Sequence, residues 1–280
     1  RTLLICRGSG CNSLNARIIN ESIEESIKNN KLEKTIEIKK TGCHGFCQVG
    51  PTLIIQPDNI LYVHLKIDDI DTIIEKHLKN DEIVEELLYK DPTTGNYIKN
   101  LDDIQFYQRQ YPLITKNCGK INPEDIKEFL SIGGYASIKR VLEKFNPLDV
   151  IEEIKKSGLR GRGGAGFPTG QKWLFCQQAS GQPKYLICNG DEGDPGAFMD
   201  RAILESDPHS VIEGMMIAAY AIEAKKGYAY IRAEYPLAIK RFSLALKQAE
   251  DAGFLGKNIF GSGFDFEIEL KKGAGAFVCG

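Results

Sequence analysis

The stretch GLRGRGGAGFPTGQKW, residues 158–173, constrains the fold and function of this chain more than any other segment. It places five glycines between positions 161 and 170, together with Arg160, Arg162 and Lys172. Glycine allows a positive φ and lets the backbone approach a ligand without an intervening Cβ. Consecutive N–H groups in such a loop can hold an anion, and neighbouring cations add favourable charge. The run therefore predicts a loop that binds the phosphate of a nucleotide-like cofactor. A flexible linker is the alternative, but linkers rarely carry Phe, Trp and three cations.

The residues after this run alternate between strand-like and helix-like patterns. Strands are expected at 184–189, 228–233 and 265–271, and helices at 208–225 and 236–252. This alternation predicts an α/β fold with a parallel sheet and right-handed crossovers. Ligands of such sheets bind beyond the carboxyl ends of the strands, which is where residues 189–194 are expected.

The first eighty residues carry the pattern of a second, smaller α/β unit. The expected order is a strand at 2–7, a helix at 14–30 capped by Ser13, a strand at 35–40, a hairpin of 52–56 with 60–65, and a helix at 67–78. Residues 81–120 are interpreted as a connector, with a helix-like piece at 82–89 and a break at 91–95. The predicted domains are therefore 1–80, the connector 81–120, and 121–280.

Half of the eight cysteines crowd into the first fifty residues, as Cys6, Cys11, Cys43 and Cys47. Each pair follows a predicted strand in a glycine-containing loop, so four thiolates can meet at one end of the domain. Such a set suits zinc or an iron–sulfur cluster. Structural zinc usually uses tighter C-x₂-C spacing, which favours the cluster, and unligated core thiols are the third reading. His44, inside the second pair, is expected to be a solvated loop residue. The other four cysteines (Cys118, Cys176, Cys188 and Cys279) are expected to be buried free thiols.

Three strings resemble the FMN-binding, NADH-oxidising flavoprotein subunit of respiratory complex I and its relatives, the diaphorase subunits of soluble hydrogenases and formate dehydrogenases. They are the glycine run, CNGDEGDPGAFMDR at 188–201 and GAGAFVCG at 273–280. The resemblance runs from about Ile121 to the end of the chain. The cysteine spacing resembles that of thioredoxin-like two-iron, two-sulfur ferredoxins. The two parts in one chain are most similar to the beta subunit of NAD(P)-linked, electron-bifurcating iron-only hydrogenases.

The resemblance implies a thioredoxin-like [2Fe–2S] domain followed by a Rossmann-like domain that binds FMN and NAD(H) or NADP(H). Phe167 and Phe175 are candidates to stack on the adenine, with core packing as the alternative, and a solvated turn is the alternative for the carboxylates at 191–194. No catalytic side chain is required, because the flavin carries the chemistry. The implied cofactor-binding residues are Gly161, Arg162, Gly163, Gly164, Ala165, Gly166, Phe167, Lys172, Phe175, Asn189, Asp191, Glu192 and Asp194, and the implied cluster ligands are Cys6, Cys11, Cys43 and Cys47.

The expected function is that of a subunit of a soluble multi-subunit oxidoreductase, most similar to a hydrogenase. Such a subunit exchanges hydride between NAD(P)H and FMN and passes single electrons to iron–sulfur clusters. The alternatives are the diaphorase subunit of an NAD-dependent formate dehydrogenase or of complex I, and a non-enzymatic iron–sulfur electron carrier with an unused flavin site. The implied partners are a hydrogenase or formate dehydrogenase catalytic subunit, a small 2Fe-2S subunit and ferredoxin.

In the resembling family the third string continues into a glutamate pair and a further region with another iron–sulfur cluster. The chain stops at Gly280, so we expect it to be cut from a longer protein whose missing region holds 4Fe-4S clusters. A net charge of −2 gives no electrostatic reason to expect nucleic acid. The longest apolar run, 215–222, is too short to span a bilayer, and no targeting segment is visible. These features predict a cytoplasmic protein.

Overall fold

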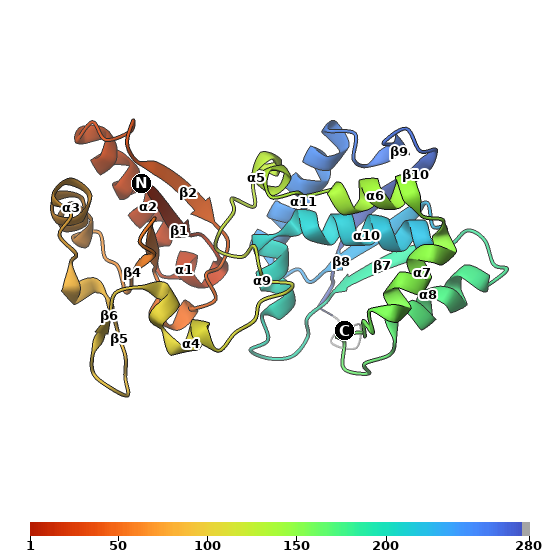
Figure 1. Ribbon diagram of the computed structural model, residues 1–280, viewed down its shortest axis with the longest axis horizontal. Coiled ribbons are helices and arrows are strands. Elements are labelled where there is room, and N and C mark those ends of the chain that lie inside the picture. Colours follow the sequence, from red (N-terminus) through yellow and green to blue (C-terminus); the bar gives the residue numbers. More distant parts are fainter. Residues whose placement is uncertain (276–280) are drawn as a thin grey trace. The chain divides into compact units, whose positions relative to one another are not determined.

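The computed structural model describes residues 1–275, and the chain divides into two compact units, Arg1–Asn122 and Pro123–Gly280. Figure 1 shows unit 1 in red to yellow and unit 2 in green to blue. Each unit contains its own sheet and its own helices. In the described part of the chain, no helix has the length and apolar character that a membrane crossing needs.

Unit 1 is built on a four-stranded sheet in the order β2-β1-β3-β4. The central strand β1 (Thr2–Cys6) runs parallel to β2 (Glu37–Thr41) and antiparallel to β3 (Leu53–Gln56), which pairs with β4 (Ile60–Tyr62). The helices that precede residue 80 are α1 (Ser9–Ser13), α2 (Ala16–Asn29) and α3 (Asp69–Thr72), and α3 continues as a π-helix over Ile73–Lys79. The strands and long helices agree with the sequence prediction. Ser13 does not cap α2, because it ends α1 and its hydroxyl donates to the Gly10 carbonyl.

Both faces of the unit 1 sheet are apolar, because successive side chains of a strand point to opposite faces. Leu3 and Ile5 pack with isoleucines of α2 and of the 69–79 helix. Leu4 faces the other way and packs with Ile54 and with side chains of residues 89–107. The segment predicted as a connector therefore covers the second face of this sheet.

That covering segment consists of short elements. It contains two 3₁₀ turns (Glu85–Leu87 and Leu101–Asp103), the hairpin of β5 (Tyr89–Lys90) with β6 (Tyr97–Ile98), and the one-turn helix α4 (Gln105–Gln108). The helix expected at 82–89 is wrong, because Leu88 and Tyr89 pack on the sheet in extended backbone.

Unit 2 contains a sheet in the order β7-β8-β10-β9. Strands β7 (Tyr185–Gly190), β8 (Lys226–Ile231) and β10 (Phe264–Lys272) are parallel, which confirms the predicted α/β fold. The short strand β9 (Gly256–Ile259), which was not predicted, pairs antiparallel with β10. The helices are α5 (Ile126–Ser131), α6 (Ala136–Lys144), α7 (Pro147–Lys156), α8 (Thr169–Gln178), α9 (Met199–Ser206), α10 (Pro208–Ile222) and α11 (Pro236–Asp251).

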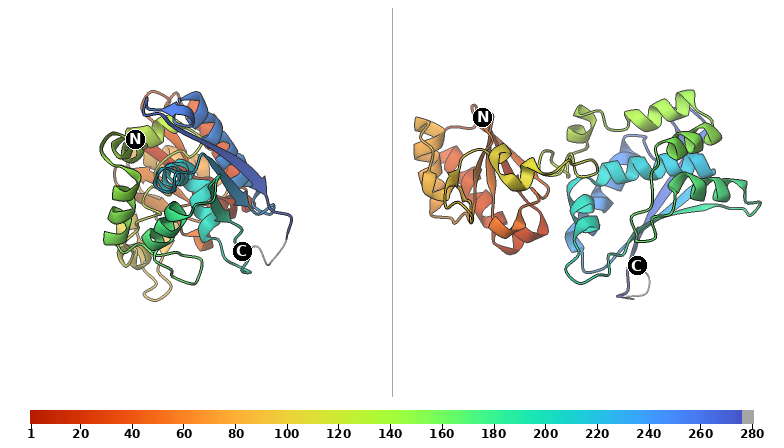
Figure 2. Two further views of the ribbon diagram at one scale, coloured as in Figure 1. Left: turned by 90° about the vertical axis from the view of Figure 1, so that its right-hand side faces the viewer. Right: turned by 60° about the horizontal axis from the view of Figure 1, so that its bottom comes forward.

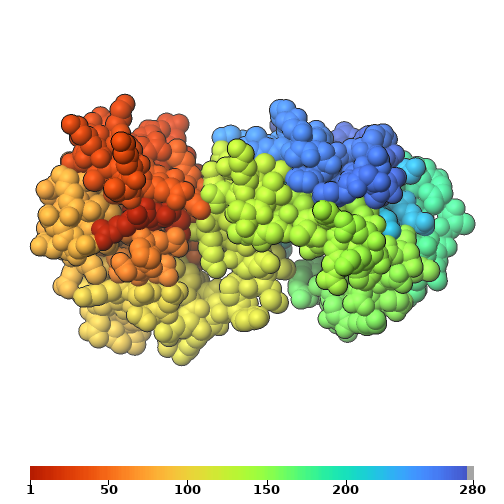
Figure 3. Space-filling view, turned by 45° about the horizontal axis from the view of Figure 1, so that its top comes forward, coloured from red at the N-terminus to blue at the C-terminus, as the bar shows by residue number. Residues whose placement is uncertain are grey.

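Helices α10 and α11 are the crossovers of this sheet, and α10 packs on it (Figure 2). Met216 of α10 is fully buried. Glycine at position 227 of β8 leaves room for the Phe266 ring, because a Cβ on residue 227 would lie 2.7 Å from that ring. Buried Arg241 of α11 donates to the Glu124 carboxylate at 3.1 Å. This contact ties α11 to the segment entering α5, and the two form a continuous face of unit 2 in Figure 3.

Candidate functional site

The glycine run forms a closed loop between α7 and α8. The Gly161 amide donates to the Phe167 carbonyl at 2.9 Å, and the Thr169 amide donates to the Leu159 carbonyl at 2.9 Å. The Arg160 guanidinium spans the loop and donates to the Gly166 carbonyl at 2.8 Å. These bonds fix the ends of the loop and leave the residues between them exposed, which is the arrangement that an anion-binding loop needs.

Two glycines of this loop adopt a conformation that other residues rarely take. The φ angles of Gly164 and Gly166 are 104° and 61°. The space beside both glycines is open, because a Cβ on either residue would have no other atom within 4 Å. The backbone, not side-chain crowding, therefore requires glycine here.

Helix α8 begins directly at the end of the loop. In the described chain, no side chain caps this helix, whose N-cap position is held by Pro168. Free amides and the helix dipole make such an N-terminus attractive to an anion, and exposed Lys172 adds a cation in the first turn. Gly170 lets α8 lie against α7, because a Cβ there would come within 2.7 Å of the Lys155 backbone nitrogen.

Two aromatic side chains flank the loop on the surface. Phe167 is 48% exposed and Phe175 is 58% exposed, and their ring centroids lie 6.5 Å apart. The alternative that Phe175 is a core residue is therefore wrong. The pair offers an apolar surface beside the predicted phosphate site, on which a flat ring can stack.

The second predicted segment leaves the carboxyl end of β7, as expected. Asn189 and Gly190 are the last residues of the strand, and the Asn189 side-chain oxygen accepts from the Asp191 amide at 3.0 Å. Gly273, the first residue of the third string, follows β10 at the same sheet edge, where a Cβ would lie 3.4 Å from Asp191 Oδ1. Residues 276–280 of that string lie outside the described residues. Figures 1 and 2 show the glycine loop and the loop after β7 on the same side of unit 2.

The Glu192 carboxylate binds the N-terminus of α9. One oxygen accepts from the amides of Met199 (2.7 Å) and Asp200 (3.2 Å), and the other accepts from the Arg201 amide (3.2 Å) and the Tyr235 hydroxyl (3.0 Å). Burial, with the added charge of Glu192, raises the pKa of Asp200 above its ordinary value. Both oxygens of the Glu192 carboxylate therefore accept hydrogen bonds from groups of the protein itself.

Asp194 differs from Glu192 because it is exposed at the tip of the same loop. Its carbonyl accepts from the Ala197 amide in a turn that projects the side chain outward. Asp194 is thus exposed to a ligand, whereas Asp191, directly after β7, is half-buried.

The residues around Glu192 were not predicted from the sequence. Tyr235 and Arg232 follow β8, and Arg201 lies in α9. A signal was present, since Tyr235 follows a predicted strand whose carboxyl end borders residues 189–194. From the sequence alone, however, Tyr235 could not be distinguished from an ordinary residue at the start of a helix.

In unit 1 the four predicted ligand cysteines lie at one end of the sheet. Cys6 ends β1, Cys11 lies in α1, and Cys43 and Cys47 flank a loop after β2, with their sulfurs 3.4 Å apart. The Cys6 thiol hydrogen-bonds the thiols of Cys11 and Cys43. The described cysteines form no disulfide, and three of these four are buried while Cys47 is half-buried.

Glycines bring the two cysteine loops together. A Cβ on Gly10 would lie 3.0 Å from the Cys47 sulfur, and one on Gly50 would lie 3.0 Å from the Cys11 sulfur. The Gly45 amide donates to the Cys43 sulfur at 3.2 Å. Hydrogen bonding from Cys11, together with burial, raises the pKa of Cys6 to about 12, and the pKa of Cys11 is lowered by the same bond. Among the described residues, no three or more His, Cys, Asp or Glu side chains converge in the way that a single metal ion requires, and the Cys43 and Cys47 sulfurs meet as a pair.

His44 is buried, so the expectation of a solvated histidine is wrong. Its ring nitrogens lie 2.9 Å from the Thr41 hydroxyl and 3.0 Å from the Thr52 hydroxyl. Burial lowers the pKa of His44 to about 4, which keeps the ring neutral. The Tyr107 hydroxyl donates to the His44 carbonyl at 3.0 Å, so the covering segment also holds the cysteine loop.

The other described cysteines (Cys118, Cys176 and Cys188) are half-buried, and Cys279 lies outside the described residues. Burial raises the pKa of Cys188 to about 11, so its thiol stays protonated.

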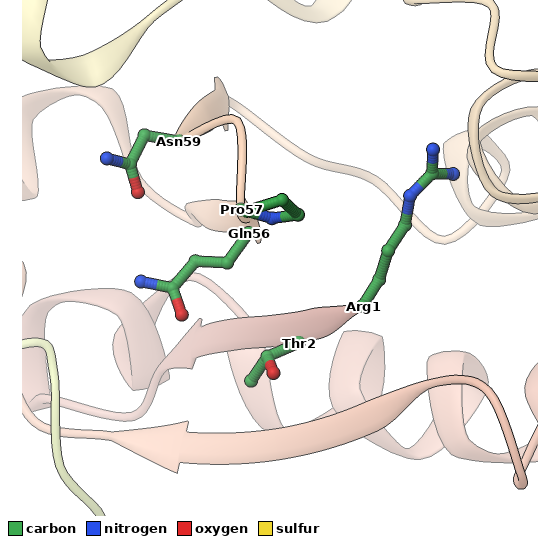
Figure 4. A pocket seen from close by; sticks show the side chains of 5 residues that line it. All are labelled: Arg1, Thr2, Gln56, Pro57 and Asn59. Atoms are coloured by element: carbon green, nitrogen blue, oxygen red, sulfur yellow. The ribbon is translucent and has the colours of Figure 1, made fainter.

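The surface of unit 1 contains recesses at the two ends of its sheet. The recess in Figure 4, about 420 Å³, lies at the end of the sheet opposite the cysteines and is lined by Arg1, Thr2, Gln56, Pro57 and Asn59. The other, about 590 Å³, adjoins the cysteine loop through Phe46, Gln48 and Val49.

Comparison with known proteins finds similarity over the larger part of unit 2. Residues 154–280 match the family model of the Nuo51 FMN-binding domain. The NADP-reducing hydrogenase subunit HndC of Solidesulfovibrio fructosivorans is 57% identical over 173 residues, which are 62% of this chain and 35% of that protein. A subunit of the NADH-quinone oxidoreductase of Rhizobium meliloti is 47% identical over 169 residues, 60% of this chain and 40% of that protein.

The chain thus matches about 35% to 40% of the length of these curated relatives. A solved NAD⁺-reducing [NiFe]-hydrogenase in its H₂-reduced state aligns with 99% of this chain and 44% of its own, at 25% identity and a TM-score of 0.49.

Proposed function

We propose that this chain is part of an FMN-binding, NAD(P)H-oxidising subunit of a cytoplasmic multi-subunit oxidoreductase. The observation that carries the proposal is the closed, exposed glycine loop at the uncapped start of α8, within the region that matches the FMN-binding family. Bound FMN supplies the redox chemistry, exchanging two electrons with a nicotinamide and single electrons with iron–sulfur centres. The described side chains bind, orient and shield the cofactors.

The FMN phosphate is assigned to the glycine loop and the first turn of α8. Gly163, Gly164 and Ala165 leave the backbone of the loop open, and Arg162 and Lys172 supply positive charge. A phosphate carries up to two negative charges and several acceptor oxygens, which these donors match. Charged donors of this kind contribute about 1.5–3 kcal/mol each when the bond is partly shielded from water.

The hydroxyl groups of the FMN ribityl chain are assigned to Asn189, and those of the dinucleotide ribose are assigned to Asp191 and Asp194. Neutral hydroxyls need acceptors, and the exposed Asn189 and Asp194 and the half-buried Asp191, at and beyond the carboxyl end of β7, provide them. Phe167 and Phe175 are assigned to the adenine of the dinucleotide, since both rings are about half exposed.

We also propose that the four cysteines of unit 1 hold a [2Fe–2S] cluster. In such a cluster each iron takes two protein thiolates. Two observations fit this requirement. The Cys43 and Cys47 sulfurs lie together as a pair, and glycines leave room beside the cysteine sulfurs. Thiolates packed so closely repel one another unless a cation offsets their charge, and the Gly45 amide adds a hydrogen bond to one sulfur.

The similarity to HndC favours a hydrogenase as the larger assembly. The partners would then be the catalytic hydrogenase subunit and small iron–sulfur subunits, and the 4Fe-4S clusters would belong to regions outside this chain. A formate dehydrogenase or complex I is the alternative assembly.

The test uses the full-length subunit in its native complex, purified without oxygen. Replacing Lys172 by Met should lower FMN affinity by about tenfold or more, because a charged phosphate donor is lost. Lys139→Met is the control, since Lys139 is an exposed lysine of α6 outside the site. Equal FMN affinity in both variants would refute the phosphate assignment. A wild-type complex without flavin or NAD(P)H oxidation would refute the proposed function and favour the electron-carrier alternative.

A further inference from the structure

One tyrosine holds both ends of the loop that follows β7. Tyr235 lies between β8 and α11 and is 6% exposed. Its hydroxyl oxygen is 3.0 Å from Glu192 Oε2 and 3.2 Å from the Ala197 carbonyl oxygen. Glu192 is near the start of the loop and Ala197 near its end, so a single phenol spans the turn 192–197 that carries Asp194.

Two arginines hold the ring of this tyrosine in place. The Arg201 guanidinium lies 5.6 Å from the ring centroid, and the Arg232 guanidinium lies 5.1 Å from it. Arg232 also donates to the Glu192 carbonyl, so the backbone and the side chain of Glu192 are both held. Burial and the bond to Glu192 raise the pKa of Tyr235, so its hydroxyl remains a donor.

Besides Glu192, the loop held in this way carries two carboxylates, the half-buried Asp191 and the exposed Asp194. Asp191 precedes Glu192 and Asp194 follows it, and neither position is fixed by secondary structure. The orientation of both carboxylates therefore depends on where Glu192 is held. Because Glu192 is held by α9, Arg232 and Tyr235, these groups set the geometry of the ligand-facing turn.

We infer that Tyr235 is a positioning residue for dinucleotide binding. It acts through Glu192 and Ala197 and keeps the turn 191–198 in the conformation that presents Asp191 and Asp194. The inference rests on the proposed function of this loop. The inference gives a role to Tyr235, which is not one of the residues proposed above to contact a cofactor.

The test compares Tyr235→Phe with Tyr220→Phe in the full-length complex. Both changes remove one phenolic hydroxyl and keep the ring, and the Tyr220 hydroxyl donates to the Phe145 carbonyl at 2.7 Å, away from the loop. Tyr235→Phe should raise the KM for NAD(P)H about tenfold, as expected for loss of a hydrogen bond to a charged group, with kcat changed less than about twofold. FMN content should stay at the wild-type level. Hydrogen exchange of the Met199–Arg201 amides should become faster in Tyr235→Phe only.

Unchanged KM and unchanged exchange in Tyr235→Phe would overturn the inference. Loss of FMN together with kcat would also overturn it, because the tyrosine would then support flavin binding or the fold as a whole. If the wild-type complex oxidises no NAD(P)H, the proposed function fails, and the exchange data alone decide whether Tyr235 holds the loop.

Discussion

Replacing Glu192 by Gln should loosen the start of α9. The carboxylate accepts hydrogen bonds from three backbone amides and one phenol, whereas a carboxamide has one acceptor oxygen and turns an NH₂ group toward the remaining donors. Losing the charge at a helix N-terminus costs about 0.5–1 kcal/mol, and leaving one amide without an acceptor costs about 1–3 kcal/mol. The expected local cost is about 2 kcal/mol, since the loop is partly exposed and water compensates in part.

The assay is hydrogen exchange at Met199, Asp200 and Arg201 in the full-length subunit. A cost of about 2 kcal/mol corresponds to exchange about thirtyfold faster at these amides. Asp194→Asn is the matched control, because it also neutralises one carboxylate of the loop, but an exposed one. It should change stability by less than about 0.5 kcal/mol while raising the KM for NAD(P)H. Wild-type exchange in Glu192→Gln would refute the capping role.

Three further predictions concern the remaining parts of the two units. Gly164→Val should abolish FMN retention without affecting the unit 1 cluster, because a β-branched residue cannot adopt φ of 104° without strain, and flavin released on denaturation measures this. Cys6→Ser or Cys47→Ser in the full chain should remove most of the two-iron signal in electron paramagnetic resonance while leaving FMN bound, and tight zinc in place of iron would contradict the cluster. Burial lowers the pKa of His209 below its ordinary 6.5, so the unfolded chain binds the proton more readily and the free energy of unfolding should fall as the pH drops below about 6.5. His209→Gln should reduce that dependence in denaturant titrations at several pH values, with buried His44 of unit 1 as a second source, and an unchanged slope would exclude a contribution from His209.

The regular secondary structure of the fold could be predicted because its sequence patterns are local. Strands β7, β8 and β10 and helices α10 and α11 of unit 2 follow from apolar periodicity. The segment 81–120 could not be predicted in this way, because its short elements are held by the second apolar face of the unit 1 sheet. That face is visible only once β1, β3 and β4 are paired.

The sequence predicted candidate residues for the site but not the contacts that the structure shows for them. Phe175 has helical neighbours like any core residue, and only the packing of α8 shows that it is exposed. His44 meets Thr41 and Thr52 only after the cysteine loop folds back on the sheet. Glu192 stands 43 residues from Tyr235 in the sequence, so nothing local indicated that its carboxylate is bound by protein donors.

The most direct measurement is the flavin content of the full-length subunit in its native, anaerobically purified complex. Denaturation should release FMN in an amount equal to that of the subunit, identified by chromatography against FMN and FAD standards. Gly164→Val should release none. A flavin-free wild-type complex that retains its iron, or one that contains only FAD, would contradict the assignment of the glycine loop as the FMN site.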